Sequence, residues 1–105
     1  MEVTAYKATD GRIYVELRDS EDKSIWCASH PAGDGYYAAQ EFKFVAIGAN
    51  DPVRDGWDER ETVPAGSIEL ACCEVWRDNT ESDLRESLSS NARDLAPDFA
   101  SVFEE

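Results

Sequence analysis

Apolar and polar residues alternate along the first twenty positions, with the period of two that is typical of β-strands. The pair Asp10-Gly11 lies at the centre of this pattern and is a strong turn signal, so we predict a β-hairpin over residues 3–19. A two-residue turn pairs Tyr6 with Val15. That register places residues 4, 6 and 8 on one apolar face together with Ile13, Val15 and Leu17. It turns the other face toward water, with Arg12, Tyr14, Glu16 and Arg18.

Three further strands are predicted from short runs rich in aromatic and β-branched side chains. They cover residues 24–30, 40–49 and 67–77. The run 67–77 is apolar on both faces for most of its length, so we expect it at the centre of the sheet. Between the last two runs, residues 50–66 hold two prolines, two glycines and five acids, which predicts a long polar loop.

From residue 80 onward the pattern becomes that of short helices. Thr80 followed by Asp83 is a capping-box pattern, and Pro97 fits the first turn of a later helix. Residues 89–91 are polar and are expected to separate the helices. The last apolar residues recur every three or four positions and predict a stripe that docks on the sheet: Leu95, Phe99, Val102 and Phe103.

These elements together predict an α+β fold. We expect a five-stranded, mainly antiparallel sheet with short C-terminal helices packed on one face. The 105 residues fit a single domain, β-rich over 1–77 and helical over 80–105. No apolar run approaches the ~18 residues of a membrane span, and no basic and apolar leader opens the chain, so we expect a cytoplasmic location.

Charge then changes the picture, because 23 acidic residues stand against 10 basic ones and give a formal net charge of −13. A surplus of this size repels nucleic acid and anionic membranes and favours basic partners. Two zones hold much of it, residues 51–61 and residues 78–105. Trp57 lies in the first zone, and exposed aromatic rings among charges are typical interface anchors. The pair Tyr36-Tyr37 is a second candidate anchor. For both, the alternative is a ring packed back on the core.

Catalytic and metal-binding chemistry find little support in the sequence. Cys27, His30, Cys72 and Cys73 are zinc-ligand types, but neighbours on a strand point to opposite faces, so the cysteines are expected in the core. The acids of the polar loop lack the spacing of an EF-hand. No nucleophile elbow, zinc-protease motif, phosphate loop or dinucleotide fingerprint occurs. We therefore expect no enzyme, no metal and no cofactor.

The sequence favours a small acidic inhibitor that occupies the basic nucleic-acid-binding site of a partner protein. In size, charge and compactness the chain resembles phage-encoded anti-CRISPR and anti-restriction decoys of the DNA-mimic type, which implies carboxylates in place of phosphates. The predicted partner-binding residues are Asp51, Asp55, Trp57, Asp58, Glu59, Glu61, Asp83, Glu86, Asp94 and Asp98. Two alternatives stay open: a toxin-neutralising immunity protein, and an acidic domain of a halophile with no decoy role.

Overall fold

The computed structural model describes residues 1–29, 35–46, 57–75 and 79–104, and it has an α+β fold. Its antiparallel sheet has the strand order β4-β3-β2-β1-β5. The strands are β1 (Glu2–Lys7), β2 (Ile13–Arg18), β3 (Ser24–Ser29), β4 (Asp58–Glu59) and β5 (Ile68–Glu74). The helices are α1 (Gly35–Ala46), α2 (Glu81–Glu86), α3 (Ala92–Leu95) and α4 (Pro97–Phe103). The predicted fold class is confirmed.

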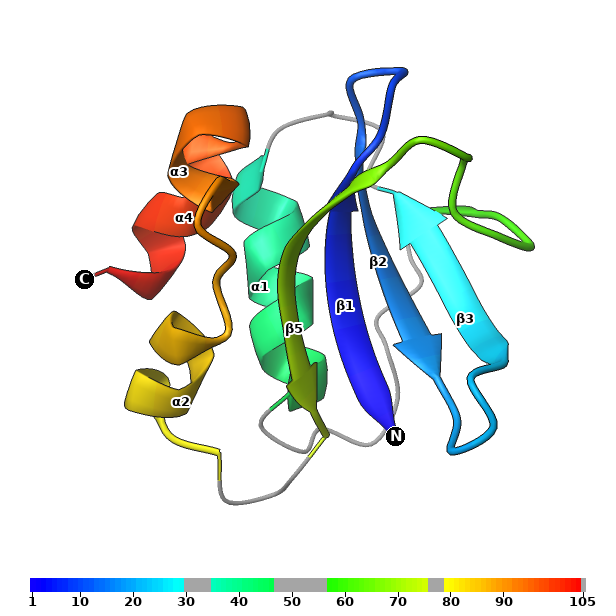
Figure 1. The fold of residues 1–105 in the computed structure, drawn as a ribbon, viewed down its shortest axis with the longest axis horizontal. Helices are drawn as coiled ribbons and strands as arrows, with labels where there is room; N and C mark the ends of the chain where they lie inside the picture. Colours follow the sequence, from blue (N-terminus) through cyan, green and yellow to red (C-terminus); the bar gives the residue numbers. More distant parts are fainter. Residues whose placement is uncertain (30–34, 47–56, 76–78, 105) are drawn as a thin grey trace.

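The helices gather on one side of the sheet (Figure 1). α1 packs directly on β1 and β2, α4 packs mainly on α1, and α3 contacts both α4 and β5. Phe42 of α1 meets Phe99 and Phe103 of α4 with ring centroids 6.0 and 5.6 Å apart. The two helices come very close at Gly35, where an added Cβ would lie 2.5 Å from the backbone nitrogen of Phe99. Only glycine fits that crossing.

The β1–β2 hairpin forms, but the predicted register is wrong by one residue. Tyr6 pairs with Tyr14 instead of Val15, because the turn between Ala8 and Arg12 has three residues. In such a loop the last residue is left-handed, and Gly11 has a φ of +86°.

This shift exchanges the two faces of β1. Val3 and Ala5 face the helices and join the core with Ile13 and Val15, whereas Thr4 lies on the far face. The side chain of Asp10 stabilises the longer turn. Its carboxylate accepts hydrogen bonds from the Arg12 backbone N–H at 2.8 Å and from the Tyr14 hydroxyl at 3.0 Å.

The strand predicted at 40–49 is wrong, since residues 40–46 belong to α1. β-propensity suggested a strand, but the buried positions Ala38, Phe42 and Val45 recur at helical spacing and pack against the sheet and α4. The fifth strand of the sheet is instead the short β4, inside the segment predicted to be a loop. The strands predicted at 24–30 and 67–77 are confirmed over Ser24–Ser29 and Ile68–Glu74.

β5 lies at an edge of the sheet, not at its centre as predicted. Its outer side is nevertheless covered, because residues 87–89 run beside it. The Cys72 N–H donates to the Ser87 carbonyl at 3.2 Å, and the Ser89 N–H donates to the Leu70 carbonyl at 2.8 Å. Because residues 87–89 hydrogen-bond to the outer edge of β5, this edge strand can have the apolar sequence that is typical of a central strand.

The C-terminal helices begin where the sequence predicts. Thr80 and Asp83 form a complete capping box at the start of α2, and Pro97 is the first residue of α4. Phe99 and Phe103 are buried as expected, but they pack mainly on α1, so the sheet contact of this layer comes through α3.

Candidate protein-binding surfaces

The described parts of the two acidic zones, residues 57–61 and 79–104, adjoin opposite edges of the sheet (Figure 1). β4 pairs with β3, whereas α3 packs on β5. Three strands separate β4 from β5, which corresponds to about 19 Å at the usual strand spacing. In the described part of the chain the zones therefore form two separate surfaces.

Trp57 is half-buried and packs on the core, with its ring centroid 6.2 Å from that of Trp26. Glu59 accepts a hydrogen bond from the indole N–H of Trp26 at 3.2 Å. The alternative that the sequence left open, a ring tucked against the edge of the core, describes Trp57 better than a free anchor does. The Trp57 side chain, packed against Trp26, holds the adjoining β4 on the sheet.

The other acids predicted in this zone differ in their surroundings. Asp58 forms an ion pair with Arg12 at 2.6 Å, which ties β4 to the hairpin turn. Glu61 is exposed and makes no hydrogen bond or ion pair that involves the described residues. Asp51 and Asp55 lie outside the described residues.

Asp83, from the second zone, has a structural role. Its carboxylate accepts hydrogen bonds from the Thr80 backbone N–H at 2.8 Å and from the Thr80 hydroxyl at 3.0 Å. These bonds stabilise the charged form and lower the pKa of Asp83 below its usual value. A carboxylate used in this way presents less free charge to a partner.

Three other predicted acids of the second zone are exposed on successive helices: Glu86 on α2, Asp94 on α3 and Asp98 on α4. None of them forms an ion pair within the described residues. The nearby Arg93 is already bound to Glu104. We call these three residues, Glu86, Asp94 and Asp98, the acidic helix surface. No ion pair within the described residues neutralises any of them, although the exposed Arg85 precedes Glu86 in α2.

Aromatic side chains also gather on the outer face of α1. Tyr36 and Tyr37 are 51% and 46% exposed, with an edge-to-face contact at a centroid distance of 5.4 Å. Phe44 lies two turns further along the helix and is 40% exposed. The exposure of the tyrosine pair agrees with the expected second anchor, and its use in binding stays a prediction.

The far face of the sheet holds a buried ion pair that the sequence did not indicate. Glu16 is only 2% exposed and accepts a bond from Arg18 Nε at 2.6 Å. An acid in an alternating strand is normally taken as solvent-facing. Here the loop after β4 folds over part of that face, and Val63 packs on Tyr14 and Cys27.

Cys27 lies on β3 and the neighbours Cys72 and Cys73 lie on β5, and all three are poorly suited to nucleophilic catalysis. Burial raises the pKa of the Cys27 thiol to about 12 and that of Cys73 to about 11, and it also raises the pKa of Cys72. Such thiols are protonated near neutral pH and are weak nucleophiles. No group of three metal-ligand side chains occurs among the described residues. His30 lies outside them.

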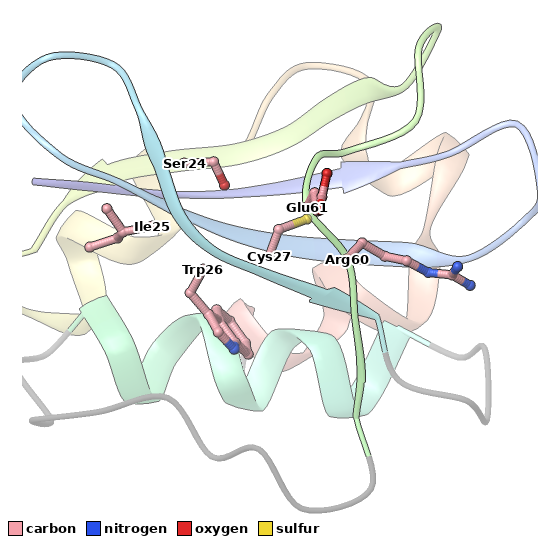
Figure 2. A pocket seen from close by; sticks show the side chains of 6 residues that line it. All are labelled: Ser24, Ile25, Trp26, Cys27, Arg60 and Glu61. Atoms are coloured by element: carbon pink, nitrogen blue, oxygen red, sulfur yellow. The ribbon is translucent and has the colours of Figure 1, made fainter.

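A groove of about 310 Å³ opens beside β3 (Figure 2). Trp26 points from β3 toward α1, whereas Arg60 extends away from the strand. The lining residues are Ser24, Ile25, Trp26, Cys27, Arg60 and Glu61. Sequence reasoning missed this groove, because it depends on β4 ending after two residues.

Comparisons with known proteins add no identification. No family model matches the chain, and no curated protein or solved structure is significantly similar to it. None of the described helices has the length and apolar character needed to cross a bilayer. Only the charge and the geometry of the chain itself therefore bear on its function.

Proposed function

We propose that the chain is a small acidic inhibitor that binds the basic nucleic-acid-binding surface of a partner protein. The observation that supports this most directly is the acidic helix surface, where Glu86, Asp94 and Asp98 are exposed without an ion-pair partner in the described structure. With a net charge of −13 the whole molecule adds to their field.

The packing beneath these carboxylates holds them in place. Leu84, Ala92 and Phe99 are buried under α2, α3 and α4 respectively, one beneath each acidic residue's helix. A surface that is ordered before binding loses less conformational entropy when the partner docks. Three charges on a fixed layer are therefore better suited to replace phosphates than the same charges on a loose tail.

Binding of this kind is electrostatic competition. Lysine and arginine side chains of the partner bind carboxylates instead of phosphates, so nucleic acid and the inhibitor exclude each other. Long-range attraction makes association fast at low salt, and screening weakens it as the Debye length falls to ~8 Å at physiological ionic strength.

The test is capture of partner proteins on the immobilised chain at low and high salt, followed by elution with duplex DNA. We expect a basic nucleic-acid-binding protein to be retained at low salt and released by DNA. The variant Glu86→Gln/Asp94→Asn/Asp98→Asn should weaken retention on the order of tenfold, because several charge contacts are removed together.

A matched control removes three acids elsewhere, Glu2→Gln/Glu69→Gln/Glu74→Gln on β1 and β5, with the same change in net charge. It should retain the partner nearly as well as the unaltered chain. Equal weakening by both variants would show that net charge alone matters. Failure of DNA to displace the captured protein would show that the nucleic-acid site is not the one occupied.

A further inference from the structure

β4 covers only half of its neighbour in the sheet. It pairs with Ala28 and Ser29 of β3, and the last bond of this pairing runs from the Arg60 N–H to the Cys27 carbonyl at 2.9 Å. From Ser24 to Trp26 no strand lies outside β3 in the described structure. We call residues 24–26 the open edge of β3.

The groove beside β3 lies along this open edge (Figure 2). Ile25 lines it and is 51% exposed, so its side chain is accessible to a ligand in the groove. An added strand would cover the residues that line the groove and would shield the Ile25 side chain from water. Main-chain hydrogen bonds to an exposed sheet edge are a common way to bind an extended peptide.

Acidic segments flank the open edge at both ends. The turn before β3, residues 19–23, holds three acids and one lysine. The segment 58–61 on the other side holds three acids and one arginine. An extended segment lying along the edge would therefore pass between two regions of net negative charge.

We propose that the open edge of β3 binds an extended basic segment of the partner as an added strand. This inference rests on the proposed function, and it gives the partner a second contact at the edge of the sheet opposite β5, the strand on which α3 packs. Backbone bonds hold the segment, Ile25 contacts an apolar residue of it, and its lysine or arginine side chains meet the flanking acids.

Charge decides between this occupant and a second copy of the chain. Pairing two open edges would bring together the acids of residues 19–23 and 58–61 from both copies. Like charges in contact oppose such a pairing, and two molecules of −13 repel each other at long range as well. A basic segment is instead attracted by both regions, because each has a net negative charge although Lys23 and Arg60 belong to them.

The experiment measures binding of a labelled peptide by fluorescence anisotropy. The probe has about ten residues that alternate lysine with valine or threonine, a pattern that favours an extended chain. A second probe is the same peptide with every second backbone nitrogen methylated, and a third carries glutamate in place of lysine. We expect the first to bind, the second to bind at least tenfold more weakly, and the third not to bind.

Ile25→Ser should weaken binding of the first probe about three- to tenfold, because contact with a half-exposed isoleucine is lost. The matched control is Ile68→Ser, which removes an isoleucine of similar exposure, 45%, from β5. Amide chemical shifts of the unaltered protein give a second measurement that needs no variant. The peptide should move the signals of residues 24–27, 60 and 61.

Three results would overturn strand addition: equal binding of the methylated and unmethylated probes, shift changes confined to α2–α4, or self-association that Ile25→Ser abolishes. The two proposals can fail separately. If the peptide binds the open edge but no basic protein is captured, the proposed function is wrong. If Ile25→Ser captures the partner normally while the acidic helix variant does not, only strand addition is wrong.

Discussion

Polar side chains on the far face of the sheet are buried although no helix covers them. Glu16, Thr4 and Cys27 are 2%, 3% and 2% exposed, and they lie side by side on three neighbouring strands. Each of these side chains either has an ion-pair or hydrogen-bond partner or is uncharged. Glu16 is paired with Arg18, the Thr4 hydroxyl donates to Cys72 Sγ at 3.3 Å, and the Cys27 thiol stays protonated.

Cys27 should couple the stability of the protein to alkaline pH. Burial, and to a smaller extent the charge of Glu16, raises the pKa of its thiol from 9.0 to about 12. The unfolded thiol loses its proton first, so the folded state holds more protons between these pH values. The free energy of unfolding must then fall as the pH rises above 9.0 toward about 12.

Urea unfolding at pH 8 and pH 10 measures this effect. We expect the Cys27→Ala variant to lose less stability between the two pH values than the unaltered chain. The other two thiols, Cys72 and Cys73, and the phenols of Tyr6 and Tyr14 also have raised pKa values and leave a residual decline. An unchanged pH dependence in the variant would mean that the thiol ionises normally in the folded protein.

At the scale of elements, sequence patterns predicted types and ends well where the signal was local. The capping box at Thr80, the proline that starts α4 and the hairpin centred on Gly11 are all present. Interactions between distant residues were not visible. The run 40–49 has the composition of a strand, and only the sheet and α4 on either side of Phe42 decide that its described part, residues 40–46, is helical.

The features of the candidate surfaces also divide into those that a sequence pattern predicts and those that depend on contacts between distant residues. The exposure of acids such as Glu86 could be predicted from the helical pattern of the sequence. The roles of Asp83 as a cap and of Glu59 as an acceptor for Trp26 depend on side-chain geometry. The open edge of β3 depends on where β4 ends, and no pattern in residues 57–61 marks that point.

Loss of the capping box should destabilise α2 without changing the fold. Thr80→Ala removes the hydroxyl that accepts a hydrogen bond from the Asp83 backbone N–H at 3.1 Å, at a cost of about 1 kcal/mol in the free energy of unfolding. Ser82→Ala, on the exposed side of the same helix, is the control and should stay within ~0.5 kcal/mol. Chemical denaturation followed by circular dichroism distinguishes the two; equal losses would contradict the capping role.

For the whole molecule, repulsion among the excess negative charges lowers the stability of the folded state. Ion pairs engage five basic residues of the described chain: Arg12, Arg18, Lys23, Lys43 and Arg93. Most acids within the described ranges form no ion pair. The core between the sheet and helices therefore has to withstand a repulsion that the surface does not neutralise.

Salt should relieve this repulsion. Raising sodium chloride from about 10 mM to about 150 mM shortens the Debye length from ~30 to ~8 Å, so the melting temperature should rise by several degrees. Differential scanning calorimetry measures the change, and the Glu86→Gln/Asp94→Asn/Asp98→Asn variant should show a smaller one. Unfolding at low salt with a steady gain up to molar salt would instead favour an acidic domain of a halophile.

The two edges of the sheet are unlike, because residues 87–89 cover β5 while no described residue pairs with the outer edge of β3 from Ser24 to Trp26. A sheet that is closed on one side can extend in one direction only. Two copies joined through their open edges would present a covered β5 at both ends, so edge-to-edge growth would end at two molecules.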